Sequence, residues 1–478
     1  MKLSAPAPTQ VERVVAHVCH VLNGGGYQQG ERLPSVRRAA LEHDVSKNTM
    51  AEAYDRLVAR GLLEARPGSG YYVASTGSGP PTRSRPSLRE ATDVVSLLRE
   101  QLDQSYEVRP GDGRPPPSWM EGSELRRHFG GFKAFKSDAV DFGYGSSRGY
   151  EPLRERLRLM LLERSIGVPI EGLLLTQGAN HALDLIVRHM LEPGDTVFVD
   201  DPGYYPLFGK LTLAKVQIVG VRRGPDGPDL GDLQAKLAAN RPKVFFTQSQ
   251  AHNPTGGALS LAVAHGLLQA ADRWGFRLVE DDAFADLLPA SAPRLAALDQ
   301  LDRVLYVGTF SKTLSASLRC GFIAGSTPTI TALADLKTVT VVATSDYVER
   351  FVHSLIVGGQ YLRHLRRLRS RLTDASAAAV AALRTVGLPT EAAKVSGFYL
   401  WTELPGSIDE RQLCRDAANE RIFLAPGQVF RPDRTASHKA AMRINVAYGA
   451  DERFLDFLRR HLPGAGAGFP ELSRRHDL

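Results

Sequence analysis

Lys312 stands at a position where a lysine can do covalent chemistry. It follows Val304–Val307, an apolar run with the length of a buried strand, and it ends the segment Gly308-Thr309-Phe310-Ser311-Lys312. A lysine at a strand end in a crevice loses its proton more readily than a solvated one and can form a Schiff base with an aldehyde. Arg319 comes seven residues later, and a guanidinium group holds phosphate through two hydrogen bonds. A single lysine is usually a solvated charge, so this interpretation needs support from other residues.

Two more polar residues follow apolar runs in the same way. Asp281 comes directly after Arg277–Glu280, and Asn253 lies beyond Val244–Thr247 in the sequence Asn-Pro-Thr-Gly. A buried carboxylate would keep a pyridine nitrogen protonated, and an asparagine amide would donate to a phenolate oxygen. Both also have structural interpretations, because Asp281 could cap a helix and Asn-Pro-Thr-Gly is a typical turn.

Two further stretches could complete the same site. Gly178-Ala179-Asn180 opens a predicted helix after Leu173–Thr176, and the free N–H groups of a helix N-terminus bind phosphate. Tyr204 could stack on a planar ring, although a buried structural tyrosine is more common. Ligands of doubly wound sheets bind at the carboxyl ends of the strands, so these residues would meet in one crevice. Together they predict a site for pyridoxal phosphate.

The elements that must position these residues alternate between short strands and helices. Predicted strands are 173–176, 196–199, 244–247, 277–280 and 304–307, and helical stretches such as 259–274 separate several of them. This alternation predicts a mostly parallel sheet covered by helices on both faces. Beyond about residue 345 the pattern changes to long helices and then to strands at 397–403 and 441–446, which is typical of a smaller α/β subdomain.

The chain has the composition of a globular protein with several domains. Residues 75–86 combine Gly, Ser and Pro without an apolar residue, so we divide the chain into a head (1–74), a linker (75–94), a large domain (95–345) and a small C-terminal subdomain (346–478). The net charge of +7 permits DNA binding without requiring it. The three cysteines have no metal-ligand spacing, and no apolar run is long enough for a membrane span. We therefore expect a cytoplasmic protein without a metal.

The head has the pattern of a winged helix. Helices are predicted at 10–23, 35–43 and 47–60, with Ser46 as an N-cap, and strands at 62–65 and 70–73 form a hairpin. In a winged helix the third helix enters the major groove of DNA. Cations lie near the helix N-termini and the hairpin, at Arg32, Arg37, Arg38, Lys47 and Arg66. A small helical packing domain would be the alternative interpretation.

Several motifs of the head resemble the GntR-type winged helix. They are Arg32-Leu33-Pro34-Ser35-Val36-Arg37, Val45-Ser46-Lys47-Asn48-Thr49, Ala53-Tyr54-Asp55-Arg56-Leu57 and Gly68-Ser69-Gly70. The resemblance implies binding of double-stranded DNA. Its contacts would be Ser35, Arg37, Ser46, Lys47 and Thr49, with Arg66 and Gly68 in the wing, and Arg38 lies where a phosphate is expected.

The body resembles the fold-type I aminotransferases over residues 120–460. The matching motifs are Tyr144-Gly145, Gly149-Tyr150, Gln177-Gly178-Ala179, Pro202-Gly203-Tyr204, Asn253-Pro254-Thr255-Gly256, Asp281, Ser311-Lys312, Arg319 and Met442-Arg443-Ile444-Asn445. The resemblance implies that Lys312 is the Schiff-base lysine, that Asp281 pairs with the pyridine nitrogen, and that Asn253 contacts the ring oxygen.

The same resemblance assigns the remaining contacts. Gly178, Ala179, Asn180, Thr309 and Arg319 would hold the phosphate. Tyr204 would stack on the ring, Tyr144 would reach over from a partner subunit, and Arg443 would bind the α-carboxylate of an amino acid. One departure concerns Phe284, which stands where relatives usually have a tyrosine that also bonds the ring oxygen. The loss of that hydrogen bond to the ring oxygen should weaken proton-transfer chemistry.

A GntR-type head joined to an aminotransferase-like body resembles the MocR/GabR-like transcription regulators. This resemblance implies a regulator that senses an amino-group ligand, or pyridoxal phosphate itself, through a Schiff base at Lys312. It also implies a homodimer, in which the heads could be swapped between subunits. Two alternatives stay open: a working aminotransferase that the head tethers to DNA, and a dimeric regulator without the cofactor. The basic helix 361–372 is interpreted as a solvated or dimer surface rather than as a second DNA contact.

Overall fold

The computed structural model describes residues 9–23, 27–28, 30–66, 69–74, 94–120, 128, 143–388, 397–434 and 436–462. The chain divides into two compact units, residues 1–85 and 86–478, and each is described by itself. Gly68, predicted to lie in the wing, is outside the described residues. Among the described residues, none of the helices combines the length and the apolar character that crossing a membrane requires.

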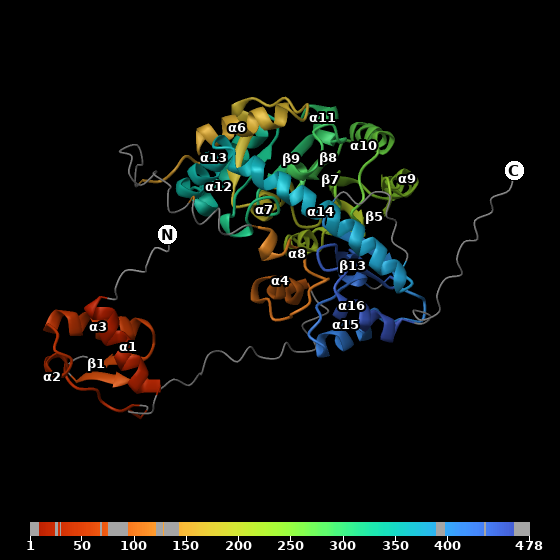
Figure 1. The fold of residues 1–478 in the computed structure, drawn as a ribbon. Coiled ribbons are helices and arrows are strands. Elements are labelled where there is room, and N and C mark those ends of the chain that lie inside the picture. The colour runs from red at the N-terminus through yellow and green to blue at the C-terminus, as the bar shows by residue number, and fades with distance from the viewer. Residues whose placement is uncertain are drawn as a thin grey trace. The chain divides into compact units, whose positions relative to one another are not determined.

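The first unit is a winged helix, as predicted. It contains α1 (Gln10–Asn23), α2 (Val36–Glu42), α3 (Lys47–Ala59) and the antiparallel hairpin of β1 (Leu63–Arg66) and β2 (Gly70–Val73) (Figure 1). Ser35 and Ser46 cap α2 and α3, because their hydroxyls accept the N–H groups of Arg38 and Thr49. Ser35 therefore lies just outside α2. The core of this unit gathers apolar residues of all three helices with Leu33 and Leu63.

The second unit is built on an eight-stranded sheet in the order β3-β10-β9-β8-β7-β4-β5-β6. Its strands are β3 (Leu173–Thr176), β4 (Thr196–Asp201), β5 (Gln217–Gly224), β6 (Gly227–Pro228), β7 (Pro242–Thr247), β8 (Arg277–Asp281), β9 (Val304–Thr309) and β10 (Gly321–Ala324). Strands β9, β8, β7, β4 and β5 are parallel, whereas β10 is antiparallel to both of its neighbours and β6 is antiparallel to β5. The predicted mostly parallel sheet is confirmed.

Both faces of this sheet are buried. In β9, Val304 and Tyr306 join one hydrophobic cluster, and the alternating Leu305 and Val307 join another. The first cluster includes residues of α6 (Glu151–Leu162), α10 (Leu261–Trp274), α11 (Leu295–Asp299), α13 (Asp346–Val357) and α14 (Gln360–Thr385), and also of α9 (Leu230–Ala239). The second includes residues of α4 (Val94–Asp103), α7 (Ala179–Met190), α8 (Tyr205–Leu213) and α12 (Thr327–Val341). Helices therefore cover the sheet on both sides.

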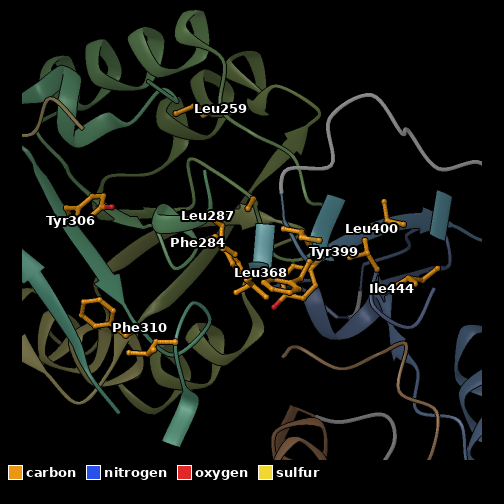
Figure 2. Close-up of a cluster of buried hydrophobic side chains, with 14 of the residues drawn as sticks. Leu259, Phe284, Leu287, Tyr306, Phe310, Leu368, Tyr399, Leu400 and Ile444 are labelled. Atoms are coloured by element: carbon orange, nitrogen blue, oxygen red, sulfur yellow. The ribbon is translucent and has the colours of Figure 1, made fainter. Parts of the chain in front are cut away.

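The C-terminal part of the chain forms a smaller sheet with its own helices. Its strands are β11 (Tyr399–Glu403), β12 (Ala425–Pro426) and β13 (Ala441–Asn445), with β13 in the middle, and its helices are α15 (Glu410–Asn419) and α16 (Glu452–His461). Helix α14 runs from the large sheet toward this subdomain (Figure 1). Figure 2 shows the apolar cluster where the two meet, with Phe284 beside Tyr399.

Candidate functional site

Lys312 lies just after β9, and the residue as a whole is half-buried. Its Nζ donates a hydrogen bond to the carbonyl of Gly113, which comes from a loop almost 200 residues earlier in the chain. Burial is the main cause that lowers the pKa of Lys312 from its ordinary value of 10.5 to about 8. The cations Arg443 and Arg114 act in the same direction, and Asp112 and Asp281 oppose them. A substantial fraction of this amine is neutral near physiological pH, as a nucleophilic lysine requires.

Asp281 is the last residue of β8 and is buried. Its Oδ2 accepts a hydrogen bond of 2.8 Å from Nε2 of Gln248, whereas its Oδ1 has no hydrogen-bond partner among the described residues. Burial raises the pKa of Asp281 to about 6, although the bond from Gln248 opposes that shift. The residue caps none of the described helices, since the short 3-10 helix that follows is preceded by Phe284. The capping interpretation is therefore not supported, and an open carboxylate oxygen is available for a cationic ligand atom.

An anion cradle forms at the N-terminus of α7. Gly178 precedes the helix with φ of 77°, and a Cβ there would lie 3.2 Å from Nη2 of Arg319 and 3.4 Å from Oγ of Ser311. Oγ1 of Thr309 lies 3.1 Å from the same Ser311 hydroxyl. The structure thus brings together the first turn of α7, with Ala179 and Asn180, and the side chains of Thr309 and Arg319. Free helix N–H groups with a guanidinium and hydroxyls fit a phosphate.

Arg443 of β13 is fully buried beside Asn253. Its Nη1 donates to Oδ1 of Asn253 at 2.9 Å and its Nη2 to the carbonyl of Gly111 at 2.6 Å, whereas its Nε has no hydrogen-bond partner among the described residues. The guanidinium packs over the rings of Tyr399 and Phe430, with its Cζ 4.7 Å and 5.0 Å from their centroids. A buried guanidinium with an unpaired N–H can receive a carboxylate.

Two predicted tyrosines have different surroundings. Tyr204, after β4, lines a cavity of about 20 Å³ with Asp281 and Gln248. Burial raises the pKa of the Tyr204 hydroxyl, so it stays protonated. Tyr144 is 88% exposed and lines a separate hollow of about 260 Å³ with Tyr150 and Arg350. Its contact with the site of a partner subunit stays a prediction.

Some residues at this site carry no signal in the sequence. Gln248 bridges Asp281 and Asn253, and Tyr399 donates to the same Gly113 carbonyl as Lys312, at 2.9 Å. The loop with Gly113 is a Pro- and Gly-rich stretch that resembles an ordinary connection. Phe284 is buried against Phe398 and Tyr399, with ring centroids 5.6 Å and 5.7 Å away, and so packs as a core residue.

The face of the head around the N-termini of α2 and α3 exposes several of the predicted DNA contacts. Arg37, Arg38 and Lys47 are exposed, and Arg38 pairs with Glu42 at 2.9 Å. Ser46 is exposed, and Thr49 is half-buried with its Oγ1 2.8 Å from Oγ of Ser46. In the hairpin, the guanidinium carbon of Arg66 lies 4.3 Å from the ring centroid of Tyr72. The contacts of these residues with DNA stay predictions.

The basic helix α14 has contacts of its own within the body. Arg369 donates to the carbonyl of Asp286 at 2.6 Å, and Arg371 donates to that of Trp119 at 3.1 Å. Part of its positive charge therefore stabilises backbone carbonyls of neighbouring segments, and its interpretation as a solvated or dimer surface stays a prediction.

The second unit is similar to known aminotransferases in sequence and in structure. Residues 107–460 match the family model "Aminotransferase class I and II", and a 2-aminoadipate transaminase from Thermus thermophilus is 31% identical over 350 residues, which cover 70% of this chain and 85% of that protein. The chain belongs to the aminotransferase class I and II family. The crystal structure of a Pyrococcus horikoshii kynurenine aminotransferase, in complex with PMP, superimposes with a TM-score of 0.70 at 26% identity, over 78% of this chain and 93% of that one.

The head has a family match of its own. Residues 10–73 match the model "Bacterial regulatory proteins, gntR family". A relative that includes both parts is the uncharacterized HTH-type transcriptional regulator YdfD of Bacillus subtilis, which is 26% identical over 476 residues and 97% of each chain. The chain therefore joins a GntR-type winged helix to an aminotransferase domain, as its motifs predict.

The aminotransferase domain fits pyridoxal phosphate, the cofactor that its family and fold support. The open Oδ1 of Asp281 suits a protonated ring nitrogen, and the cradle at Gly178 and Arg319 suits a phosphate. Lys312, with its lowered pKa, suits an aldehyde. These three features were present in the sequence as strand-end residues of the aminotransferase domain. Their contacts with the cofactor stay predictions.

Proposed function

We propose that this protein is a DNA-binding transcriptional regulator whose aminotransferase domain binds pyridoxal phosphate and senses an amino-group ligand or the cofactor itself. The observation that carries the proposal is the presence of a gntR-family head and a fitting cofactor site in one chain. The similarity to YdfD, which is named as a transcriptional regulator, extends over both parts.

In this proposal each residue of the site has one task. Lys312 would hold the aldehyde carbon, Asp281 the ring nitrogen, and Asn253 the ring oxygen. The phosphate is held by Gly178, Ala179, Asn180, Thr309 and Arg319, with Tyr204 against the ring. Pyridoxal phosphate supplies an electron sink for an amine bound to it.

Arg443 gives the site its preference for a carboxylate. Its guanidinium is buried between Tyr399 and Phe430, where a charge-assisted hydrogen bond is strong. The ligand class is therefore an amino acid with an α-carboxylate. The two cations Lys312 and Arg443 both donate to carbonyls of the segment 109–114, through Gly113 and Gly111. Ligands that bind these cations act directly on that segment, which follows the linker and α4 in the chain.

A homodimer is part of the proposal. Tyr144 is 88% exposed, although the aminotransferase resemblance makes it a cofactor contact, and a second subunit would reconcile the two. The test is to mix Tyr144→Phe chains with Lys312→Ala chains. A mixed dimer has one site with neither substitution, so recovery of ligand binding in the mixture supports a shared site. Ligand binding by the mixture that equals the sum of what the two variants bind separately contradicts a shared site.

A second candidate function has its own support. The similarity to a 2-aminoadipate transaminase, together with a set of site residues that lacks only the tyrosine replaced by Phe284, favours an active aminotransferase that the head holds on DNA. A panel of amino acids with a keto acid acceptor distinguishes the two functions. Repeated turnover at rates of about 1–1000 per second would be ordinary for an enzyme and would overturn a purely regulatory role.

A further inference from the structure

We propose that Gln248 is a positioning residue of the cofactor site, which holds Asp281 with one carboxylate oxygen turned outward and fixes Asn253 in the same contact. The proposal rests on the proposed cofactor site. Gln248 follows β7 and is buried. Its Nε2 donates to Oδ2 of Asp281 at 2.8 Å, and its Oε1 accepts the backbone N–H of Asn253 at 2.8 Å. A single amide thus joins the residues assigned to the ring nitrogen and to the ring oxygen of the cofactor.

The orientation of this amide follows from its partners. A backbone N–H can only donate, so the oxygen of the Gln248 amide must face Asn253 and the nitrogen must face Asp281. The amide nitrogen donates its hydrogen bond to Oδ2 of Asp281, and Oδ1 has no hydrogen-bond partner among the described residues. Gln248 therefore decides which of the two oxygens of Asp281 is available to the ring nitrogen.

The backbone of Gln248 is itself fixed by a buried ion pair. Its N–H donates to Oδ2 of Asp200 at 3.4 Å, and its carbonyl accepts from Nη2 of Arg223 at 2.9 Å. Asp200 and Arg223 pair at 2.9 Å, with side chains 4% and 0% exposed. Because the ion pair holds both the N–H and the carbonyl of Gln248, the position of its side-chain amide does not depend on Asp281 or Asn253. The amide can therefore orient these two residues.

The donated hydrogen bond also affects the charge of Asp281. Burial raises the pKa of this carboxyl to about 6, the Gln248 amide lowers it, Asp282 raises it and Lys312 lowers it, and Tyr204 faces the same carboxylate. Removing the amide favours the neutral acid, which cannot hold a protonated ring nitrogen. A positive charge on the ring lowers the pKa of groups that are conjugated with the ring. Loss of that charge should therefore raise the pH at which the visible band of the bound cofactor titrates.

The test compares Gln248→Leu with Gln250→Leu in the full-length protein. Gln250 is an equally buried amide two residues along, but its Nε2 donates to the carbonyl of Pro293 at 2.7 Å rather than to Asp281. We expect Gln248→Leu to weaken pyridoxal phosphate binding by about tenfold or more, the size of a lost hydrogen bond to a charged group, and to raise the titration pH of the visible band. Gln250→Leu should leave both values unchanged.

A second variant keeps the test decisive if Gln248→Leu does not fold. Gln248→Glu has the same shape and still accepts the Asn253 N–H, but it presents an oxygen to Asp281. Two adjacent carboxylates share one proton, so its affinity for the cofactor should recover as the pH falls. Wild-type affinity and titration in both Gln248 variants would overturn the inference. A wild-type protein that binds no pyridoxal phosphate would instead overturn the proposed function, and the inference with it.

Discussion

At the scale of single residues, the central feature is the lowered pKa of Lys312. The amine reacts only when it is neutral, and its pKa is about 8. The rate at which the apoprotein captures the cofactor should therefore increase as the pH rises from 6.5 to 9, and it should level off above the pKa of Lys312. Stopped-flow absorbance after mixing with pyridoxal phosphate measures this rate. A rate that does not change across this interval would contradict the assigned role.

The substitution Lys312→Ala should abolish the visible absorbance of the bound cofactor. Lys439→Ala is a suitable control, because Lys439 is a surface lysine that pairs with Glu403 at 3.1 Å. Spectra of both variants after incubation with excess pyridoxal phosphate and dialysis make the comparison. Retention of the band in Lys312→Ala would assign the chemistry to another amine.

Arg443 belongs to the same scale but to a different step. The variant Arg443→Lys keeps a positive charge but loses the guanidinium fork, so it should bind pyridoxal phosphate normally and bind amino acids about 10- to 100-fold more weakly. Titration of the visible band with an amino acid and with its decarboxylated amine measures both effects. An equal loss for the amine and the amino acid would contradict recognition of the carboxylate.

At the scale of elements, two substitutions at the N-cap of α3 distinguish an effect on folding from an effect on DNA binding. Ser46 accepts the N–H of Thr49 at 3.1 Å and is exposed. Ser46→Ala should lower the free energy of unfolding of the head by about 1 kcal/mol, whereas Ser46→Asp should keep the cap. The aspartate adds a negative charge on the predicted DNA face and should weaken DNA binding at full stability. Thermal unfolding and fluorescence anisotropy with DNA measure the two effects, and full DNA affinity in Ser46→Asp would count against this face.

The loop that contacts Lys312 and Arg443 has a steric constraint of its own. A Cβ on Gly111 would lie 2.5 Å from the backbone of Leu424 and Ala425, whereas one on Gly209 of α8 would meet no atom within 4 Å. Gly111→Ala should therefore destabilise the protein by about 1–3 kcal/mol, and Gly209→Ala should be neutral or stabilising. Denaturant unfolding of the two variants tests this, and equal stability would show that the loop can move aside.

The elements also show how far the sequence can predict this site. Lys312, Asp281 and Gly178 were predicted because strand ends of a parallel sheet converge, a rule that needs only the order of strands and polar residues. Strand β10 is not among the strands predicted from the sequence, and an apolar run looks the same in either direction. Gln248 and the carbonyl of Gly113 were missed because their roles arise from hydrogen bonds between segments that are distant in the sequence or lack a motif.

At the scale of the whole molecule, one chain combines a predicted DNA-binding head with a predicted cofactor site in the body. Arg37→Ala in the head should weaken DNA binding by about 1–3 kcal/mol if it contacts a base. Arg56→Ala is the control, because Arg56 lies farther along α3 and pairs with Glu52 at 2.7 Å. Neither substitution should change cofactor binding in the body. Loss of the visible band in Arg37→Ala would show that the two parts do not act as separate units.

The measurement that tests the central claim most directly is the DNA affinity of the full-length protein with and without pyridoxal phosphate and an amino acid ligand. A DNA fragment from the region upstream of its own gene serves as the probe, and Lys312→Ala is measured in parallel. We expect the ligands to change the DNA affinity of the wild-type protein several-fold and to leave that of Lys312→Ala unchanged. Identical affinities of the wild-type protein under all conditions, together with rapid transamination, would contradict this expectation.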